Sequence, residues 1–398
     1  MIEIGPGSGA DGGRVIAQGT VAQVEVDPAS RIGPFLSGAQ VVRRKGKGAD
    51  GKASEGSPVV DGADGSDLFS DGRIHMDTGA IHTVHPLSVD VPVGKLTAVT
   101  GVSGSGKTTL VLESLIPALE AHIAGRELPD HVKAVGPAGI KRVDLVDATP
   151  IGVNVRSTVA TYSGVMDDLR KLFAKAPEAK ARGLKAGAFS YNTGSLRCMT
   201  CDGTGQISLD VQFLPDVDIP CPSCHGSRYG DEAYEVRVCT ETGGLSLPDM
   251  LAMTVDELLS VECGLGKAKT KLETLHDLGL GYLTLGESTP ALSGGEAQRL
   301  KLASEMHRDQ KGSLFVFDEP TIGLHPLDVE TLLGVLDGLI DRGATVLVIE
   351  HDLDVIANSD YVIDLGPGGG EVGGRLVAEG TPAQVAANPE SVTGRYLR

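Results

Sequence analysis

Three groups of residues in this chain are of types, and at spacings, that can do chemistry. The first is GVSGSGKT at Gly101–Thr108, which fits the phosphate-binding pattern GxxxxGK[ST]. The second is four cysteines, arranged as two CxxC pairs between residues 198 and 224. The third is an Asp-Glu pair at 318–319 and a histidine at 351, each close behind an apolar run. Together they indicate a nucleotide-hydrolysing domain with a metal-bound module built into it.

The phosphate-binding loop lies between a predicted strand, Leu96–Thr100, and a predicted helix, Thr109–Glu120. Backbone N–H groups of such a loop surround the phosphates, and the helix N-terminus adds positive potential. We expect Lys107 to reach the β and γ oxygens of ATP and Thr108 to bind Mg²⁺. The candidate nucleotide-binding residues of the loop are Gly101, Gly104, Ser105, Gly106, Lys107, Thr108 and Thr109.

Two further apolar runs each predict a buried strand. Ser313–Phe317 leads into Asp318 and Glu319, and Thr345–Ile349 is followed two residues later by His351. An acid at a strand end can hold Mg²⁺, and a second acid beside it can polarise the attacking water. We therefore predict that Asp318 binds the metal, that Glu319 is the general base, and that His351 positions the water.

The four cysteines have the spacing of a structural metal site. Nineteen residues separate the two pairs, and four thiolates so arranged can close a tetrahedral zinc site that stabilises a module with little core. A redox site is disfavoured, because one CxxC pair would suffice for it. The predicted zinc ligands are Cys198, Cys201, Cys221 and Cys224.

The composition bounds the class of protein. The chain has 398 residues, too many for one ordinary domain, and 41% of them are hydrophobic, enough for a sizeable core. It contains no apolar run of about 18 residues and no signal-peptide pattern, and its cysteines suit a reducing compartment. These features predict a cytoplasmic protein with no membrane partner.

Charge is distributed unevenly along the chain. The formal net charge of −18 disfavours a non-specific nucleic-acid binder, yet residues 141–200 carry ten Lys and Arg against five Asp and Glu. A basic face on an acidic body is one interpretation. The other is that Asp167 to Lys180 forms the solvated side of an amphipathic helix.

The start of the chain repeats its end. Sixteen residues between Gly5 and Gly33 recur, without a gap, at a constant offset of 361 residues. Each copy is predicted to be a small closing unit of turns, strand and short helix that completes a domain whose body precedes it. Residues 1–37 are thus expected to be the tail of an upstream domain. Residues 38–72, rich in Gly, Asp, Ser and Lys, are expected to form a flexible linker.

Several of these motifs resemble those of ATP-binding cassette (ABC) ATPases. The resemblance rests on GVSGSGKT, LSGGEAQR at 292–299, LFVFDEP at 314–320 and His351. It implies an α/β cassette that pairs head to tail with a second cassette. In that arrangement Ser293, Gly294 and Gly295 contact the γ-phosphate that the partner's phosphate loop holds.

Longer segments are similar to the UvrA family, the damage-sensing ATPases of nucleotide excision repair. They include 160–174, RCMTCDGTGQ at 197–206, FLPDVDIPCPSCHGSRY at 213–229 and 278–303. The resemblance implies an ABC cassette over 73–398 with an inserted signature and zinc module over 113–290, preceded by the tail of an upstream cassette. Its implied cofactors are ATP, Mg²⁺ and Zn²⁺, and its implied partners are double-stranded DNA, a second cassette and UvrB.

In that family the zinc module lies close to the DNA contacts, and the protein is an ATPase without nuclease activity of its own. The resemblance therefore makes seven cations candidates for phosphate contact. They are Lys171, Lys175, Lys180, Arg182, Lys185, Arg197 and Arg228.

Two departures from the family pattern leave a second interpretation open. The segment 147–152 reads DATPIG, with Ala148 where the family has a Gln that helps to bind Mg²⁺, and the segment after it also differs. Both departures favour a divergent paralogue that confers tolerance of DNA-binding drugs. A third candidate, the ATPase subunit of a transporter, is disfavoured because such subunits lack the Cys₄ insertion.

Overall fold

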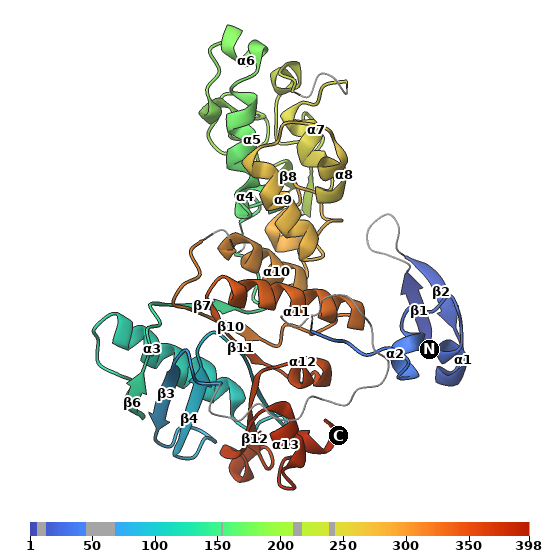
Figure 1. The fold of residues 1–398 in the computed structure, drawn as a ribbon. Coiled ribbons are helices and arrows are strands. Elements are labelled where there is room, and N and C mark those ends of the chain that lie inside the picture. Colours follow the sequence, from blue (N-terminus) through green and yellow to red (C-terminus); the bar gives the residue numbers. More distant parts are fainter. Residues whose placement is uncertain are drawn as a thin grey trace. The chain divides into compact units, whose positions relative to one another are not determined.

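The computed structural model describes residues 1–5, 13–44, 68–152, 154–209, 217–238, 243–306 and 308–397. Most of the linker expected at 38–72, and most of the FLPDV segment at 213–217, lie outside these residues. The described chain forms two compact units (Figure 1). One comprises Met1, Ala17–Ala148 and Arg308–Arg398, and the other comprises Ile2–Ile16 and Thr149–His307. The longer part of the second unit, Thr149–His307, begins and ends later than the insertion expected at 113–290, whose bounds stay a prediction.

The first unit is built on a six-stranded sheet with the order β13-β12-β5-β11-β10-β7. All neighbours are parallel except β13, which runs antiparallel to β12. The strands are β5 Leu96–Gly101, β7 Arg142–Val146, β10 Ser313–Asp318, β11 Thr345–Ile349, β12 Tyr361–Gly366 and β13 Arg375–Gly380. The α/β fold expected from the sequence is confirmed.

Both faces of this sheet are covered, as a parallel sheet requires. Leu314 and Val316 of β10 join one apolar core. Phe315 and Phe317, which alternate with them along the strand, are equally buried. The core also takes in a three-stranded antiparallel sheet with the order β4-β3-β6. Its strands are β3 Arg73–Thr78, β4 Leu87–Pro92 and β6 Val132–Gly136.

Helices of the first unit connect the strands of the central sheet. The helix predicted at Thr109–Glu120 begins as a π-helical segment, Thr109–Leu115, and continues as α3, Ile116–Ile123. The others are α11 Pro326–Asp341, α12 Leu353–Ala357 and α13 Pro382–Ala387, with short 3₁₀ turns at Gly370–Val372 and Thr393–Arg395.

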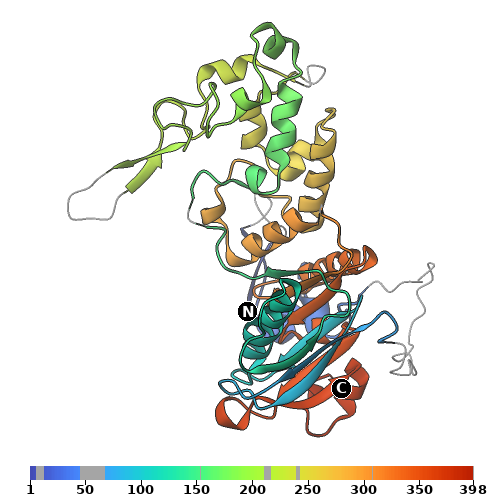
Figure 2. The ribbon, with the colours of Figure 1, turned by 90° about the vertical axis from the view of Figure 1, so that its left-hand side faces the viewer.

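The second unit is mainly helical. Its α-helices are α4 Val159–Tyr162, α5 Val165–Phe173, α6 Pro177–Ala181, α7 Leu247–Ala252, α8 Val255–Ser260, α9 Lys267–Asp277 and α10 Gly294–Glu305. Short 3₁₀ turns lie at Ala186–Phe189, Asp231–Glu235 and Thr289–Ala291. A two-stranded ribbon, β8 Gln206–Leu209 and β9 Val217–Pro220, extends from these helices (Figure 2).

The amphipathic helix considered for Asp167 to Lys180 is in fact two helices. In α5, Val165, Leu169 and Phe173 are buried at a spacing of four residues, so this helix does have one apolar face. It ends before Pro177, which begins α6. A proline restricts the residue before it to extended conformations, and Ala176 is extended, so one continuous helix is interrupted there.

The first copy of the repeat forms its own small set of elements, β1 Ile2–Gly5, β2 Arg14–Gln18, α1 Val21–Glu25 and α2 Gly33–Leu36. The strands β1 and β2 pair with each other in a separate two-stranded sheet. Within the described residues, none of the helices combines the length and the apolar character needed to cross a membrane.

The chain after α2 is held against the first unit at two points. Arg44 donates to Asp337 of α11 and forms an ion pair with Asp360 at 2.8 Å, and its backbone N–H donates to Asn358 Oδ1 at 2.7 Å. Further on, Phe69 packs against the core and meets the ring of Tyr361 edge-on. Both described ends of the segment 38–72 are therefore fixed by specific contacts.

Candidate functional site

The strand order brings three strand ends together in the first unit. β5, β11 and β10 are neighbours in the sheet, and Asp318 at the end of β10 lies opposite Ile349 of β11. Because parallel strands share one carboxyl edge, the phosphate loop, Glu319 and His351 all emerge at this edge. A cavity of about 430 Å³ opens there, lined by His82, Thr83, Ser103, Gly104, Gly106, Lys107, Thr108, Thr109, Glu319, His351 and Gly370.

Lys107 is buried at the centre of the loop. Its Nζ donates to the carbonyl oxygens of Gly101 at 2.9 Å and Val102 at 3.1 Å. Burial lowers the pKa of this ammonium, and the nearby charges of Glu319, Asp364 and Asp318 oppose that shift. Ser105 is buried too, and its Oγ has no hydrogen-bond partner in the part of the chain that the structure describes.

The carboxylates at the end of β10 face this lysine. Burial raises the pKa of Asp318, and the negative charges of Glu319 and Asp147 raise it further. Glu319 follows it with a φ of +47°, a left-handed conformation that is uncommon for a residue other than glycine. Its Oε1 lies 2.9 Å from His351 Nε2, so the predicted base and the predicted water-positioning histidine form a hydrogen-bonded pair.

The donor set of this cavity fits a magnesium nucleotide. Lys107 and Thr108 of its lining offer an ammonium and a hydroxyl, and the strand-end carboxylate of Asp318, outside the lining, interacts electrostatically with Lys107. These groups supply the chemistry that phosphate and Mg²⁺ require. The segment after β12 supports the phosphate loop through two backbone hydrogen bonds. Gly370 N donates to the carbonyl oxygen of Gly104 and Gly374 N to that of Ser105, each at 3.1 Å.

The LSGGE residues belong to the other compact unit. Ser293 is the N-cap of α10, and its backbone N–H donates to Glu296 Oε2 at 2.7 Å. Tyr282 Oη also donates to the Glu296 carboxylate, which holds this turn. Ser293 and Gly294 are exposed and Gly295 is half-buried, so the turn is open to a ligand or partner.

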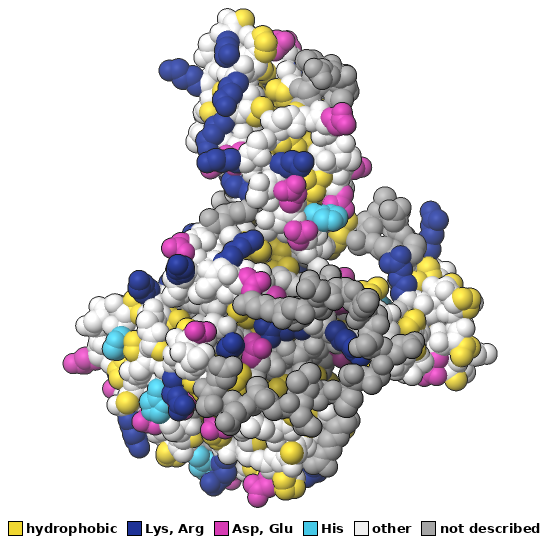
Figure 3. Space-filling model, in the orientation of Figure 1, with side chains coloured by type: hydrophobic (Ala, Val, Ile, Leu, Met, Phe, Trp, Pro, Cys, Tyr) yellow, Lys and Arg dark blue, Asp and Glu magenta, His cyan; other side chains and the backbone are white. Residues whose placement is uncertain are grey.

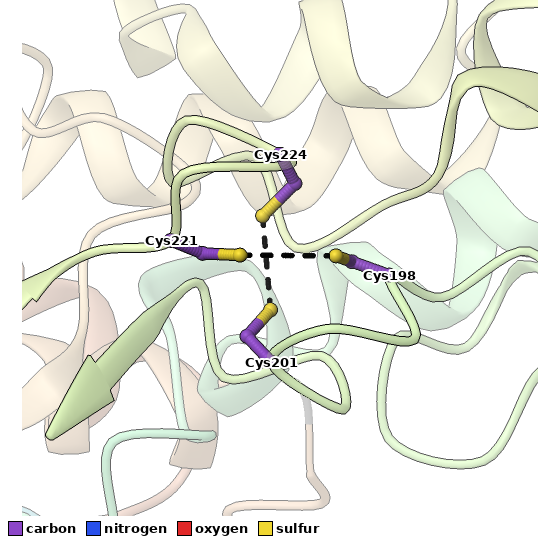
Figure 4. A group of neighbouring side chains, drawn as sticks. All are labelled: Cys198, Cys201, Cys221 and Cys224. Carbon is purple, nitrogen blue, oxygen red and sulfur yellow. Dashed lines mark hydrogen bonds between the residues drawn. The ribbon is translucent and has the colours of Figure 1, made fainter.

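The four predicted zinc ligands converge on one point (Figure 4). Their sulfur atoms all lie within 4.8 Å of one another, with Cys198 and Cys221 at 3.9 Å and Cys201 and Cys224 at 3.7 Å. A tetrahedral zinc ion with Zn–S bonds of ~2.3 Å separates its sulfurs by ~3.8 Å. Backbone hydrogen bonds from Cys224 and Ser223 lower the pKa of the Cys221 thiol, whereas burial raises the pKa of Cys224, so the sulfur distances carry the argument for a metal. The geometry therefore fits zinc.

Two buried tyrosines seat the cysteine loops on the helices of their unit. Tyr191 and Tyr229 meet edge-on with their ring centroids 6.1 Å apart. Tyr229 Oη donates to Phe189 O at 2.6 Å and Tyr191 Oη to Arg156 O at 3.0 Å. The guanidinium of Arg228 lies over the Tyr191 ring at 5.2 Å. The metal loops are thus anchored by aromatic packing as well as by thiolates.

The candidate DNA-contacting cations divide into two groups. Four of them have partners within the protein: Arg228 is buried and donates to Val155 O, Arg182 pairs with Glu232 and Glu235, Arg197 pairs with Asp202, and Lys171 pairs with Asp168. Lys175, Lys180 and Lys185 are exposed, and no acidic partner within 4 Å is found for them among the described residues. Lys and Arg side chains gather over α5 and α6 (Figure 3).

One residue near the nucleotide cavity, Glu350, was not singled out from the sequence. Glu350 is buried directly before His351, and its carboxylate accepts from Thr321, two residues after Glu319. The signal was a carboxylate immediately after a fully apolar strand, where it must be buried and needs hydrogen-bond donors. Ala148, the departure noted at 147–152, is exposed and follows Asp147.

Comparison with known proteins identifies relatives along the whole chain. No family model matches. The chain is 46% identical to UvrABC system protein A of Bacillus subtilis (strain 168) and 44% identical to that of Lactiplantibacillus plantarum, and both matches take in 100% of the chain and 40% of the relative. A crystal structure of UvrA2 from Deinococcus radiodurans superposes with a TM-score of 0.83 at 42% identity, over 100% of this chain and 45% of that one. The chain thus spans about two fifths of the length of these curated relatives.

Proposed function

Because the chain belongs to the UvrA family, we propose that it is an ATP-hydrolysing, DNA-binding protein that acts on damaged or distorted duplex DNA in nucleotide excision repair. The observation that supports this most strongly is the coexistence of two sites in one chain. One is the cavity with Lys107 and the Glu319–His351 pair, and the other is the Cys₄ cluster. Hydrolysis of ATP would change the nucleotide-bound state of the protein. The cysteine module would supply a rigid element near which DNA can bind.

In the proposed reaction each residue of the cavity has one task. Lys107 and Thr108 would bind the β and γ phosphates and Mg²⁺, and Asp318, at the end of β10 beside the cavity, would hold the metal. Glu319 accepts the proton of the attacking water at its carboxylate, and His351 Nε2, 2.9 Å away, orients that carboxylate and the water. When bound, Mg²⁺ neutralises the charge that develops on the phosphate oxygens.

A second cassette completes the proposed site. The exposed Ser293-Gly294 turn at the N-terminus of α10 offers backbone N–H groups and a hydroxyl, which suit the γ-phosphate held by a partner cassette. The partner is either another ABC domain or a second copy of this chain. UvrB is the further partner that we infer from the family.

We narrow the proposed DNA contacts to Lys175, Lys180 and Lys185, the candidate lysines for which the described residues offer no acidic partner within 4 Å. Backbone contacts of this kind carry no sequence information, so they suit a protein that binds many sequences. Distortion is then read through the ease with which the DNA deforms.

The test uses Glu319→Gln, which keeps the side-chain shape and removes its capacity to accept a proton. We expect ATP binding to stay within about twofold and turnover to fall at least about 100-fold, the usual contribution of a general base. Glu371→Gln, a change at an exposed acid of the same unit, serves as the control. Undiminished hydrolysis in Glu319→Gln would refute the assignment of the base.

The same variant, loaded with ATP, tests the DNA partner. We expect it to bind a fluorescent duplex with one bulky adduct more tightly than the intact duplex. Changing Lys175, Lys180 and Lys185 together to Ala should weaken binding and lower the salt slope by up to about 0.9 per lost contact, whereas Lys267→Ala should not. Equal binding to both duplexes would count against damage recognition.

A zinc measurement tests the metal site separately. Cys201→Ser removes one of the four sulfur ligands, so we expect lower zinc content and weaker DNA binding with unchanged nucleotide binding. Atomic absorption on the purified protein gives the zinc content. Equal zinc in the variant and the parent would exclude the site.

A second candidate function, tolerance of DNA-binding drugs, is favoured by Ala148 at the position where the family pattern has Gln. It predicts that the protein with ATP releases an intercalator from DNA faster than spontaneous dissociation does. Stopped-flow fluorescence of a bound intercalating dye, with and without the protein, separates the two functions.

A further inference from the structure

Glu350 is a buried carboxylate that the proposed reaction does not use. Glu350 is 2% exposed, and it lies between the end of β11 and His351. Both oxygens are fully engaged. Oε1 accepts from Thr321 N at 2.9 Å and from Thr321 Oγ1 at 2.7 Å. Oε2 accepts from His351 N at 2.9 Å and from Asp352 N at 3.1 Å.

The two bonds from Thr321 join segments that are distant in the sequence, and the other two hold the carboxylate to its own turn. Thr321 lies two residues after Glu319, and the other two donors belong to the turn that carries His351. A third link connects the same segments, since Glu319 N donates to Ile349 O at 2.9 Å. One carboxylate therefore ties the backbone behind Glu319 to the backbone behind His351, whose side chains meet at 2.9 Å.

A carboxylate is a costly choice for this position. Burial raises the pKa of Glu350, and the hydrogen bonds from Thr321, Asp352 and His351 oppose that rise. No Lys or Arg of the described chain forms an ion pair with it, so the donors are neutral backbone and hydroxyl groups. A residue needed only to fill space would avoid the penalty of a buried charge.

We propose that Glu350 is a positioning residue for ATP hydrolysis, which holds Glu319 and His351 in register and acts on the reaction through His351. The inference rests on the proposed hydrolytic function of the same cavity. Glu350 is not expected to touch nucleotide, because it does not line the cavity and both of its oxygens accept hydrogen bonds from Thr321, His351 and Asp352.

The first test is Glu350→Gln, which preserves size and removes one acceptor oxygen. The Gln NH₂ group is a donor, and it would face either the N–H groups of His351 and Asp352 or the two donors of Thr321. In either orientation two of the four hydrogen bonds are lost. We expect kcat to fall at least about tenfold while KM for ATP stays within about twofold. A KM rise with unchanged kcat would overturn the proposal.

A matched pair at Thr321 tests the other end of the link. Thr321→Ser keeps both donors to Oε1, and Thr321→Val keeps the shape but loses the hydroxyl donor. We expect kcat near the parent value for Ser and a fall of about threefold to tenfold for Val. Equal kcat in the two variants would contradict the role assigned to this hydrogen bond.

A double variant asks whether Glu350 acts through His351. If it does, Glu350→Gln combined with His351→Ala has the same kcat as His351→Ala alone, because residues that act as a unit are not additive. A general loss of folding would instead multiply the two effects. Multiplicative losses would therefore overturn the positioning role.

Hydrogen exchange tests the link without relying on turnover. In Glu350→Gln we expect faster amide exchange in both segments, 319–324 and 350–354, and Thr321→Val should also raise exchange at 350–354. Unchanged exchange in either segment would overturn the inference. If the parent chain does not hydrolyse ATP, the proposed function fails, and the exchange result still decides whether Glu350 couples the two segments.

Discussion

The two copies of the repeat have the same local structure and opposite surroundings. β1, β2 and α1 occupy positions that match β12, β13 and α13 at the offset of 361 residues. Met1 and Gly19 exchange two hydrogen bonds where Val362 pairs with Gly380. Yet Ile2 is 67% exposed and its counterpart Ile363 only 1%, because β12 pairs with β5 inside the six-stranded sheet. Local sequence thus builds the closing unit, and only a neighbouring sheet buries it.

A glycine pair shows what the first copy lacks. Gly13 and Gly374 both have left-handed backbones, with φ of +75° and +69°. A Cβ on Gly374 would overlap the carbonyl oxygen of Thr83, next to the phosphate loop, whereas no atom of the residues that the structure describes lies within 4 Å of a Cβ on Gly13. The first copy keeps the left-handed glycine that fits against a phosphate loop, and among the described residues no such loop contacts it. We propose that residues 1–37 close another ABC cassette.

The largest predicted contrast is in the strands. Ile363→Ala removes a core side chain and should lower the free energy of unfolding by about 2–5 kcal/mol, while Ile2→Ala should change it by less than about 0.5 kcal/mol. Denaturant unfolding followed by circular dichroism gives both values. Comparable losses would mean that β1 is already buried. In a protein that also contains the upstream cassette, Ile2→Ala should become as costly as Ile363→Ala.

The glycine pair predicts a smaller difference with a functional readout. Gly13→Ala should cost only the left-handed penalty of about 1–2 kcal/mol, and Gly374→Ala should add about 1–3 kcal/mol for the overlap. Because Gly374 N donates to Ser105 O in the phosphate loop, Gly374→Ala should also weaken nucleotide binding. Isothermal titration with an ATP analogue measures this. Equal affinities in the two variants would show that the closing unit does not influence nucleotide binding by the phosphate loop.

The smallest predicted effect is the loss of a helix cap, which should cost the same free energy in the two copies. Thr20 and Thr381 each cap a helix, and each takes part in a capping box with a Gln three residues later. Thr20→Ala and Thr381→Ala should each destabilise the local helix by about 1 kcal/mol. Amide exchange at Gln23 and Gln384 reports the two losses. An effect at one site alone would show that the caps depend on their surroundings after all.

Much of the fold could be predicted from patterns that are local in sequence. The strands at 96–100, 313–317 and 345–349 each lie within one residue of the observed bounds, because a strand buried on both faces is a short apolar run bounded by polar residues. The four cysteines were predictable for a similar reason, since CxxC spacing places two thiolates at one turn.

What could not be predicted depends on which segments meet in space. The bond between Glu350 and Thr321 exists because β10 and β11 are neighbours in the sheet, and strand order is not written in either segment. Arg44 was expected in a flexible linker, but it meets Asp337 and Asp360, about 300 positions further along the chain. The split of one expected helix at Pro177 was, by contrast, visible in the sequence.

The lysine of the phosphate loop has an energetic consequence for selectivity. Lys107 donates to two carbonyl oxygens of its own loop, and a nucleotide must replace both bonds to recruit it. Because the two carbonyls belong to the same loop, they compete with the nucleotide for Lys107 at every protein concentration. A ligand with one weakly charged oxygen gains little from the exchange, whereas a triphosphate offers several charged acceptors, which form stronger hydrogen bonds than carbonyls do. We therefore expect the loop to favour ligands that offer more charged phosphate oxygens to Lys107.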